Sequence, residues 1–126
     1  MLIEDKPDLM RELASALSND TFIVTEASNY YEALRKMDEI SPDLVILDGE
    51  LPFVNGWQAC RQIIRDFGIP VILMGKDRNV HVWRKALEVG TEFYMKIPVG
   101  RLELEARIKA ILRRYDKKRI IAGISY

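Results

Sequence analysis

Two purely apolar segments, each set between helical patterns, most constrain what this chain can fold into. Residues 44–47 read LVIL and residues 71–74 read VILM. Continuously apolar strands are typical of a parallel sheet that helices bury on both faces. Apolar or β-branched runs at residues 2–3, 21–25 and 93–95 predict three further strands.

Apolar residues at helical spacing predict five helices between and after these strands. They cover residues 6–17, 29–40, 56–66, 80–89 and 104 to about 114. Strands that alternate with helices through short connections predict an open, doubly wound α/β fold with a five-stranded parallel sheet. Ligands of such sheets bind outside the carboxyl ends of the strands, where the strand order reverses.

Composition narrows the class of protein further. The 126 residues suffice for one domain, and 19 basic residues balance 19 acidic ones. This balance gives no overall field that would attract nucleic acid or a membrane surface. No apolar run is long enough to cross a bilayer. The single Cys60 excludes an internal disulfide, is expected in the core, and fits a cytoplasmic protein.

Three acids follow predicted strands. Glu4 and Asp5 come directly after the first strand, and Asp48 follows the third. If these strands are neighbours, the carboxylates converge, and a hard cation such as Mg²⁺ would offset their repulsion. An aspartate beside Mg²⁺ can also attack phosphorus as a nucleophile. Taken singly, each acid could instead cap a helix.

The chain resembles the receiver domain of two-component response regulators over residues 2–114. The motifs that carry the resemblance are LIEDKPDL, DLVILDGELPFVNG, IPVILM, LEVGTEFY and LELEARIKAILRR, in this order and spacing. The resemblance implies a flavodoxin-like fold, phosphorylation by a sensor histidine kinase, and Asp48 as the phospho-acceptor. It also implies Mg²⁺ ligands from Glu4, Asp5, Asp48 and the backbone carbonyl of Glu50, and a rotamer change of Tyr94 on activation.

Two positions depart from the family pattern, and both concern the phosphoryl group. Gly75 stands where the family has Thr or Ser, and Ile97 stands where it has a phosphate-binding Lys. Lys96 is one residue early, which on a strand means the opposite face unless a bulge intervenes. We therefore expect an atypical receiver in which Asp48 is phosphorylated poorly or not at all.

The C-terminal part is similar to the OmpR/PhoB subfamily of response regulators. Residues 1–114 would be the receiver, and residues 115–126 a basic linker into a winged-helix output domain that alone contacts DNA. Resemblance to this subfamily implies a homodimer through the fourth helix, fifth strand and fifth helix. Its expected residues are Trp83, Glu88, Glu92, Phe93, Glu103, Arg107, Lys109 and Arg114, with Glu88 facing Lys109 and Glu92 facing Arg114 of the partner. Trp83 and Phe93 replace charged partners of Glu103 and Arg107 and predict a more apolar contact.

Two alternatives remain open on sequence alone. The chain could be a stand-alone receiver that signals through protein contacts, with residues 115–126 as a solvated tail. The acids of Asp48-Gly49-Glu50 also loosely resemble the motif of aspartate-nucleophile phosphatases. We expect no enzyme activity beyond slow self-phosphorylation and dephosphorylation at Asp48.

Overall fold

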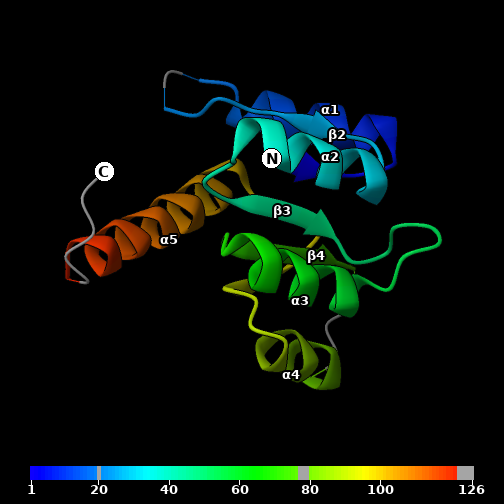
Figure 1. Ribbon diagram of the computed structural model, residues 1–126. Helices are drawn as coiled ribbons and strands as arrows, with labels where there is room; N and C mark the ends of the chain where they lie inside the picture. Colours follow the sequence, from blue (N-terminus) through cyan, green and yellow to red (C-terminus); the bar gives the residue numbers. More distant parts are fainter. Residues whose placement is uncertain (20, 77–79, 122–126) are drawn as a thin grey trace.

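Five parallel strands form one sheet, and helices cover both of its faces (Figure 1). The computed structural model describes residues 1–19, 21–76 and 80–121. The elements in chain order are β1 (Leu2–Ile3), α1 (Pro7–Leu17), β2 (Glu26–Ala27), α2 (Tyr30–Ile40), β3 (Val45–Asp48), α3 (Gly56–Phe67), β4 (Val71–Gly75), α4 (Val80–Glu88), β5 (Phe93–Lys96) and α5 (Arg101–Ile121). The predicted doubly wound α/β fold is confirmed.

The strand order is β2-β1-β3-β4-β5, so the chain reverses its direction across the sheet after β2. This reversal makes β1 and β3 direct neighbours, with Ile3 opposite Leu47. Their carboxyl ends meet at one edge, which is where doubly wound folds place ligands.

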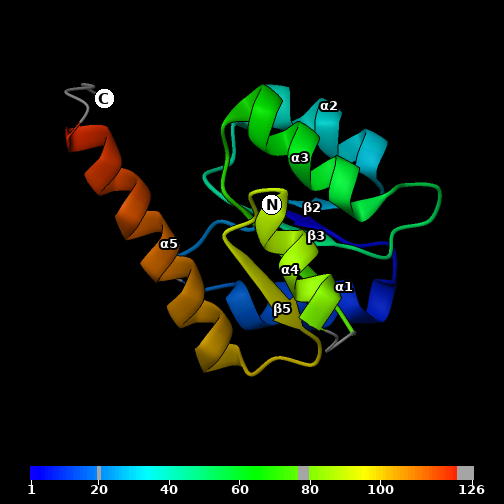
Figure 2. The same ribbon diagram turned by 90° about the horizontal axis from the view of Figure 1, so that it is seen from below.

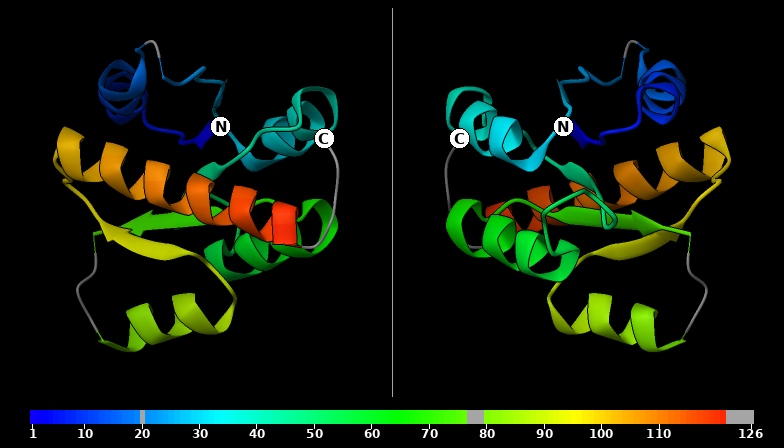
Figure 3. Two further views of the ribbon diagram at one scale, coloured as in Figure 1. Left: turned by 90° about the vertical axis from the view of Figure 1, so that its left-hand side faces the viewer. Right: turned by 90° about the vertical axis from the view of Figure 1, so that its right-hand side faces the viewer.

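Alternate residues of each strand point to opposite faces and build two separate cores. Leu47 and Leu73 belong to the core beneath α2, α3 and α4. Ile46 and Ile72 belong to the core beneath α1 and α5. Figures 2 and 3 show the sheet between these two helical layers.

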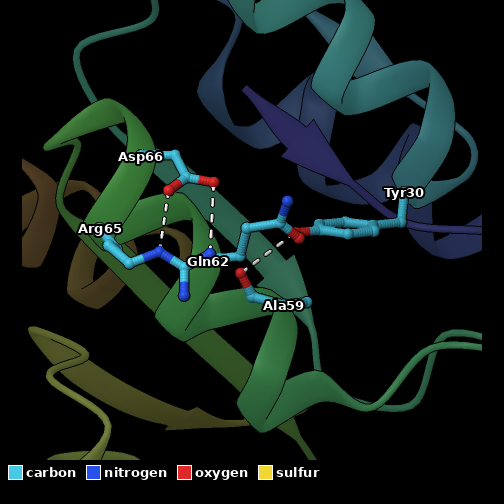
Figure 4. Close-up of polar contacts among 5 residues, drawn as sticks. All are labelled: Tyr30, Ala59, Gln62, Arg65 and Asp66. Atoms are coloured by element: carbon cyan, nitrogen blue, oxygen red, sulfur yellow. Dashed lines mark hydrogen bonds and ion pairs between the residues drawn. The ribbon is translucent and has the colours of Figure 1, made fainter.

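Local sequence fixes the helices of the first layer. Asn29 and Asn55 cap α2 and α3, since their side chains accept hydrogen bonds from backbone N–H groups of the first turn. The Tyr30 hydroxyl donates to Gln62 Oε1 at 2.6 Å and lies 3.3 Å from the Ala59 carbonyl. Figure 4 shows how this contact fastens α2 to α3.

The strand predicted over residues 21–25 is wrong in its position. The paired residues are Glu26–Ala27, and Thr25 contributes only its carbonyl, which accepts from the Leu2 N–H at 2.8 Å. Residues 22 and 24 pack their side chains on the core beneath α1 and α5, while Ile23 is 98% exposed. The β1 strand spans only Leu2–Ile3, so residues 21–24 have no strand backbone beside them.

The last helix runs further than predicted. It was expected to end near Arg114, but α5 continues to Ile121, and Figure 2 shows its end projecting beyond the sheet. No Gly or Pro interrupts the basic run, and Tyr115 packs against the core while its hydroxyl donates to Glu92 Oε1 at 2.7 Å. The predicted linker therefore begins as helix, and residues 122–126 lie outside the described part of the chain.

Candidate functional site

Glu4, Asp5 and Asp48 come together at the carboxyl edge of β1 and β3. One ligand oxygen from each lies within 4.8 Å of the others. Parallel pairing of β1 with β3 causes this, because it sets the residues after Ile3 beside the end of β3. The prediction that these three acids converge is confirmed.

Glu4 and Asp48 are buried, Asp5 is half-buried, and the carboxylate oxygens of all three are only partly hydrogen-bonded. Glu4 is 1% exposed and Asp48 is 2% exposed. The Asp5 N–H donates to Glu4 Oε2 at 2.8 Å, and the Glu50 N–H donates to Asp48 Oδ1 at 2.9 Å. Glu4 Oε1, Asp5 Oδ1 and Asp48 Oδ2 are buried and find no donor within the described residues. Buried carboxylate oxygens without donors are costly unless a proton or a cation joins them.

Burial and the neighbouring acid Asp48 change the pKa of Glu4. Burial, followed by hydrogen bonding to and repulsion by Asp48, raises the pKa of Glu4 to about 8. Without a cation, Glu4 therefore keeps its proton at neutral pH, and that proton supplies one donor to the cluster. A divalent cation would compete with the proton for the same oxygens.

The donor set fits a hard divalent cation. Three carboxylates offer oxygen atoms alone, which suits Mg²⁺ and leaves room for water ligands. Glu50 follows Asp48 at the same edge, so its carbonyl remains a predicted ligand.

Tyr94 lies directly over Gly75. A side-chain Cβ at Gly75 would be 2.3 Å from the Tyr94 hydroxyl oxygen and 3.2 Å from its Cζ. The tyrosine thus occupies the space that the Thr or Ser of the family pattern would need. The sequence identified Gly75 and Tyr94 as switch positions, but it did not predict that Tyr94 fills the space left by the absent side chain at position 75.

The bulge that could have moved Lys96 into the phosphate-binding position is not present. Pairing of β4 with β5 runs without interruption from Ile72 opposite Phe93 to Gly75 opposite Lys96. The Ile97 N–H then donates to the Gly75 carbonyl at 2.8 Å, and the Ile97 side chain packs on the core beneath α1 and α5. Because side chains alternate along a strand, Lys96 and Tyr94 lie on one face of the sheet and Ile97 lies on the other.

Several charges expected in a dimer pair within their own chain. Arg114 forms an ion pair with Glu92, and Lys109 pairs with Glu105 at 2.9 Å. The Glu92–Arg114 pair was expected between subunits, so a dimer would have to exchange it. Glu88 and Glu103 are exposed, and the Trp83 side chain lies outside the described side chains.

Arg107 stacks on the ring of Phe93, at 4.3 Å from its centroid. The sequence placed Trp83 and Phe93 where Glu103 and Arg107 would find their partners in the other subunit, whereas Arg107 and Phe93 are in contact within one chain. This contact could not be read from the sequence, because the way α5 packs against β5 decides which of their side chains meet.

Comparisons with known proteins agree with this geometry. The family model "Response regulator receiver domain" matches residues 1–109. The chain is 34% identical over 117 residues to the probable transcriptional regulator ycf27 of Guillardia theta, covering 93% of this chain and 46% of that protein. It is 35% identical over 121 residues to the transcriptional regulatory protein AfsQ1 of Streptomyces coelicolor, covering 94% and 52%. The chain thus spans about half the length of these curated relatives.

Solved structures share the fold. A CheY-like response regulator receiver domain protein from Methanospirillum hungatei superposes with a TM-score of 0.84 at 20% identity, over 93% of this chain and 94% of that one. Fold and acidic edge together define a flavodoxin-like signalling domain. The chain belongs to the response regulator receiver domain family, whose members are generally signalling domains rather than enzymes. Among the described residues, no helix is both long and apolar enough to cross a membrane.

Proposed function

We propose that this chain is the receiver of a two-component transcription regulator in which Asp48 binds Mg²⁺ but holds a phosphoryl group weakly. The observation that supports the proposal is that the acid cluster is complete, while the two side chains that would bind the phosphoryl group are absent. Glu4, Asp5 and Asp48 offer three donor-free buried oxygens. Gly75 and Ile97 offer no polar side chain to a group on Asp48.

The energetic argument concerns the two absent side chains. A charge-assisted hydrogen bond contributes about 1.5–3 kcal/mol, so each loss lowers an equilibrium by about one to two decades. The family's hydroxyl and Lys would each make such a bond to the phosphoryl oxygens. Bound Mg²⁺ would still neutralise charge on the transferred group. We therefore expect the cation site to persist while phosphorylation of Asp48 is slow or unstable.

The position of Tyr94 supports an output surface that does not depend on phosphorylation. Its hydroxyl already lies in the space beside Gly75, and its ring packs against the core beneath α2, α3 and α4. Because position 75 has no side chain that a phosphoryl group on Asp48 could bind, phosphorylation would not be coupled to the position of Tyr94.

The test compares Mg²⁺ binding with phosphorylation in the same protein. The chain is incubated with Mg²⁺ and acetyl phosphate, and the modified fraction is followed by intact mass. We expect Mg²⁺ to bind and little stable modification to form. Asp48→Asn is the control that should bind Mg²⁺ more weakly and show no modification at all.

A variant that restores the family pattern sharpens the test. Gly75→Thr together with Ile97→Lys, made in a Tyr94→Ala background so that the Thr side chain has room, should increase the modified fraction at least about tenfold, since each restored bond contributes about a decade or more. Rapid and stoichiometric labelling of the unaltered chain would contradict the proposal.

The partners follow from the relatives. Since these are named transcriptional regulators and are about twice as long, we propose that a DNA-binding output domain follows α5 and that a histidine kinase acts on Asp48. We also propose a homodimer through α4, β5 and α5, where Leu87 and Leu102 are exposed. Trp83→Ala should then shift the chain toward monomer in sedimentation, whereas an unchanged profile would count against this dimer.

A further inference from the structure

A cavity of about 180 Å³ lies beside the acid cluster, at the carboxyl end of β4 and the start of α3. Three glycines, Gly49, Gly56 and Gly75, form part of its lining. Trp57 and Tyr94 add two aromatic side chains. None of the three clustered acids lines it, but Glu50, whose carbonyl is the predicted fourth ligand, does, so this cavity adjoins the cation site.

The glycines leave bare backbone along this cavity, and two of them cannot carry a side chain without displacement. A Cβ at Gly56 would lie 2.6 Å from the Gly49 carbonyl oxygen, and one at Gly75 would lie 2.3 Å from the Tyr94 hydroxyl. The volume equals that of about six water molecules at about 30 Å³ each. Such a space matches one aromatic ring with a small substituent, and aromatic walls favour flat rings through stacking.

The charges around the cavity favour a cation over an anion. Glu50 lines it, and Asp48 lies directly before Gly49 with a buried oxygen that lacks a donor. Lys96 is opposite Gly75 in the sheet and offsets one of these negative charges. Asp5 adds a further carboxyl group at the same edge, whereas Glu4 keeps its proton without metal. Lys76, directly after Gly75, offsets a second negative charge, which leaves a net excess of one acid. In a partly enclosed space such an excess of one sign selects ligands of the other.

We infer that this cavity binds a planar, single-ring organic cation, such as an aromatic amidine or guanidine, between Trp57 and Tyr94. The inference goes beyond the proposed function, because it does not depend on whether Asp48 reacts. Since Tyr94 lines the cavity and belongs to β5, a bound ring would hold this tyrosine in place and act on the proposed output surface.

The experiment is a titration of the ¹⁵N-labelled chain with benzamidine in EDTA, without Mg²⁺, followed by amide spectra. The amides of Gly49, Gly56 and Gly75 should shift and saturate. Those of Gly90 and Gly100, which do not line the cavity, should not shift. Benzoate, with a similar ring and the opposite charge, should bind at least about tenfold more weakly.

Two variants test the walls and the charge separately. Trp57→Ala should weaken benzamidine binding at least about tenfold through lost stacking, whereas Tyr31→Ala, an exposed aromatic on α2, should leave it unchanged. Glu50→Lys alters an exposed side chain, so the fold is retained, and it should reverse the preference toward benzoate. Benzoate or inorganic phosphate binding as tightly as benzamidine, shifts spread over all glycines, or no saturation would overturn the inference. Because Mg²⁺ is absent, failure here leaves the proposed function of Asp48 to its own test.

Discussion

Gly75→Ala tests whether Tyr94 truly occupies the space of a side chain at position 75. The added Cβ would lie 2.3 Å from the Tyr94 hydroxyl oxygen, while ordinary contacts begin at 3.4 Å, so the hydroxyl must move by about 1 Å or more. Overpacking of this kind costs about 1–3 kcal/mol. Because the Tyr94 side chain can rotate away from the added methyl group, we expect a loss of stability in the lower half of that range. This loss would come from the packing contacts that Tyr94 gives up.

A double-mutant cycle separates this clash from the general effect of replacing glycine in a strand. In a Tyr94→Ala background the clash is gone, and Gly75→Ala should stabilise the protein by about 0.5–1 kcal/mol through the better strand propensity of Ala. The effect of Gly75→Ala should therefore change sign between the two backgrounds, and the coupling energy between the two positions should be about 2 kcal/mol.

The assay is urea unfolding of the four proteins, followed by tryptophan fluorescence. Gly100→Ala is a control for adding a Cβ without a clash, since that Cβ would meet no atom within 4 Å; its cost should be that of a poorer N-cap of α5, about 0.5–1 kcal/mol, and should not depend on Tyr94. If Gly75→Ala stabilised the unaltered protein, or if the cycle were additive, Tyr94 would not fill this space and the argument for a fixed output surface would fail.

Three further perturbations probe the loop, the acid cluster and the output face. Gly56→Ala places a Cβ 2.6 Å from a backbone carbonyl that cannot turn away, so it should cost more than Gly75→Ala, about 3 kcal/mol or more in urea unfolding. Because the pKa of Glu4 rises to about 8 on folding, from an ordinary value of 4.5, the folded protein holds this proton more tightly. Without metal its stability should therefore be greatest below about pH 4.5 as far as Glu4 is concerned, fall as pH rises toward about 8, and level off above. Glu4→Gln should remove this fall, as measured by urea unfolding at several pH values. Arg107→Ala should lose the contact with Phe93 and about 0.5–1 kcal/mol, and Arg107→Lys should recover part of it.

Each of these outcomes has a contrary result. A mild effect of Gly56→Ala would mean that α3 does not press on the loop after β3. Stability that rises between pH 5 and 8 and is unchanged by Glu4→Gln would mean that Glu4 is ionised in the folded protein. An Arg107→Ala variant as stable as the parent would show that the ring contact contributes nothing.

The sequence alone determined the fold class and the edge of the sheet that holds the acids. Continuous apolar strands between amphipathic helices admit few arrangements, and carboxyl ends of parallel strands share one edge, so Glu4, Asp5 and Asp48 could be assigned to that edge, while their convergence depended on β1 and β3 being neighbours, which the strand order decided. The departures at Gly75 and Ile97 were also visible, since both positions are counted from nearby Pro and Gly residues.

Tertiary structure decided how those positions are filled. That Tyr94 lies over Gly75, and that Ile97 packs into the far core, depends on the register between β4 and β5, which no local pattern records. The same holds for residues 21–25, whose β-branched sequence predicts a strand. A strand needs a paired neighbour, and β1 offers only Leu2–Ile3. Secondary-structure propensity depends on the local sequence, whereas strand pairing and side-chain packing depend on segments that are distant along the chain. The groups that surround Asp48, and therefore its chemistry, are decided by this packing.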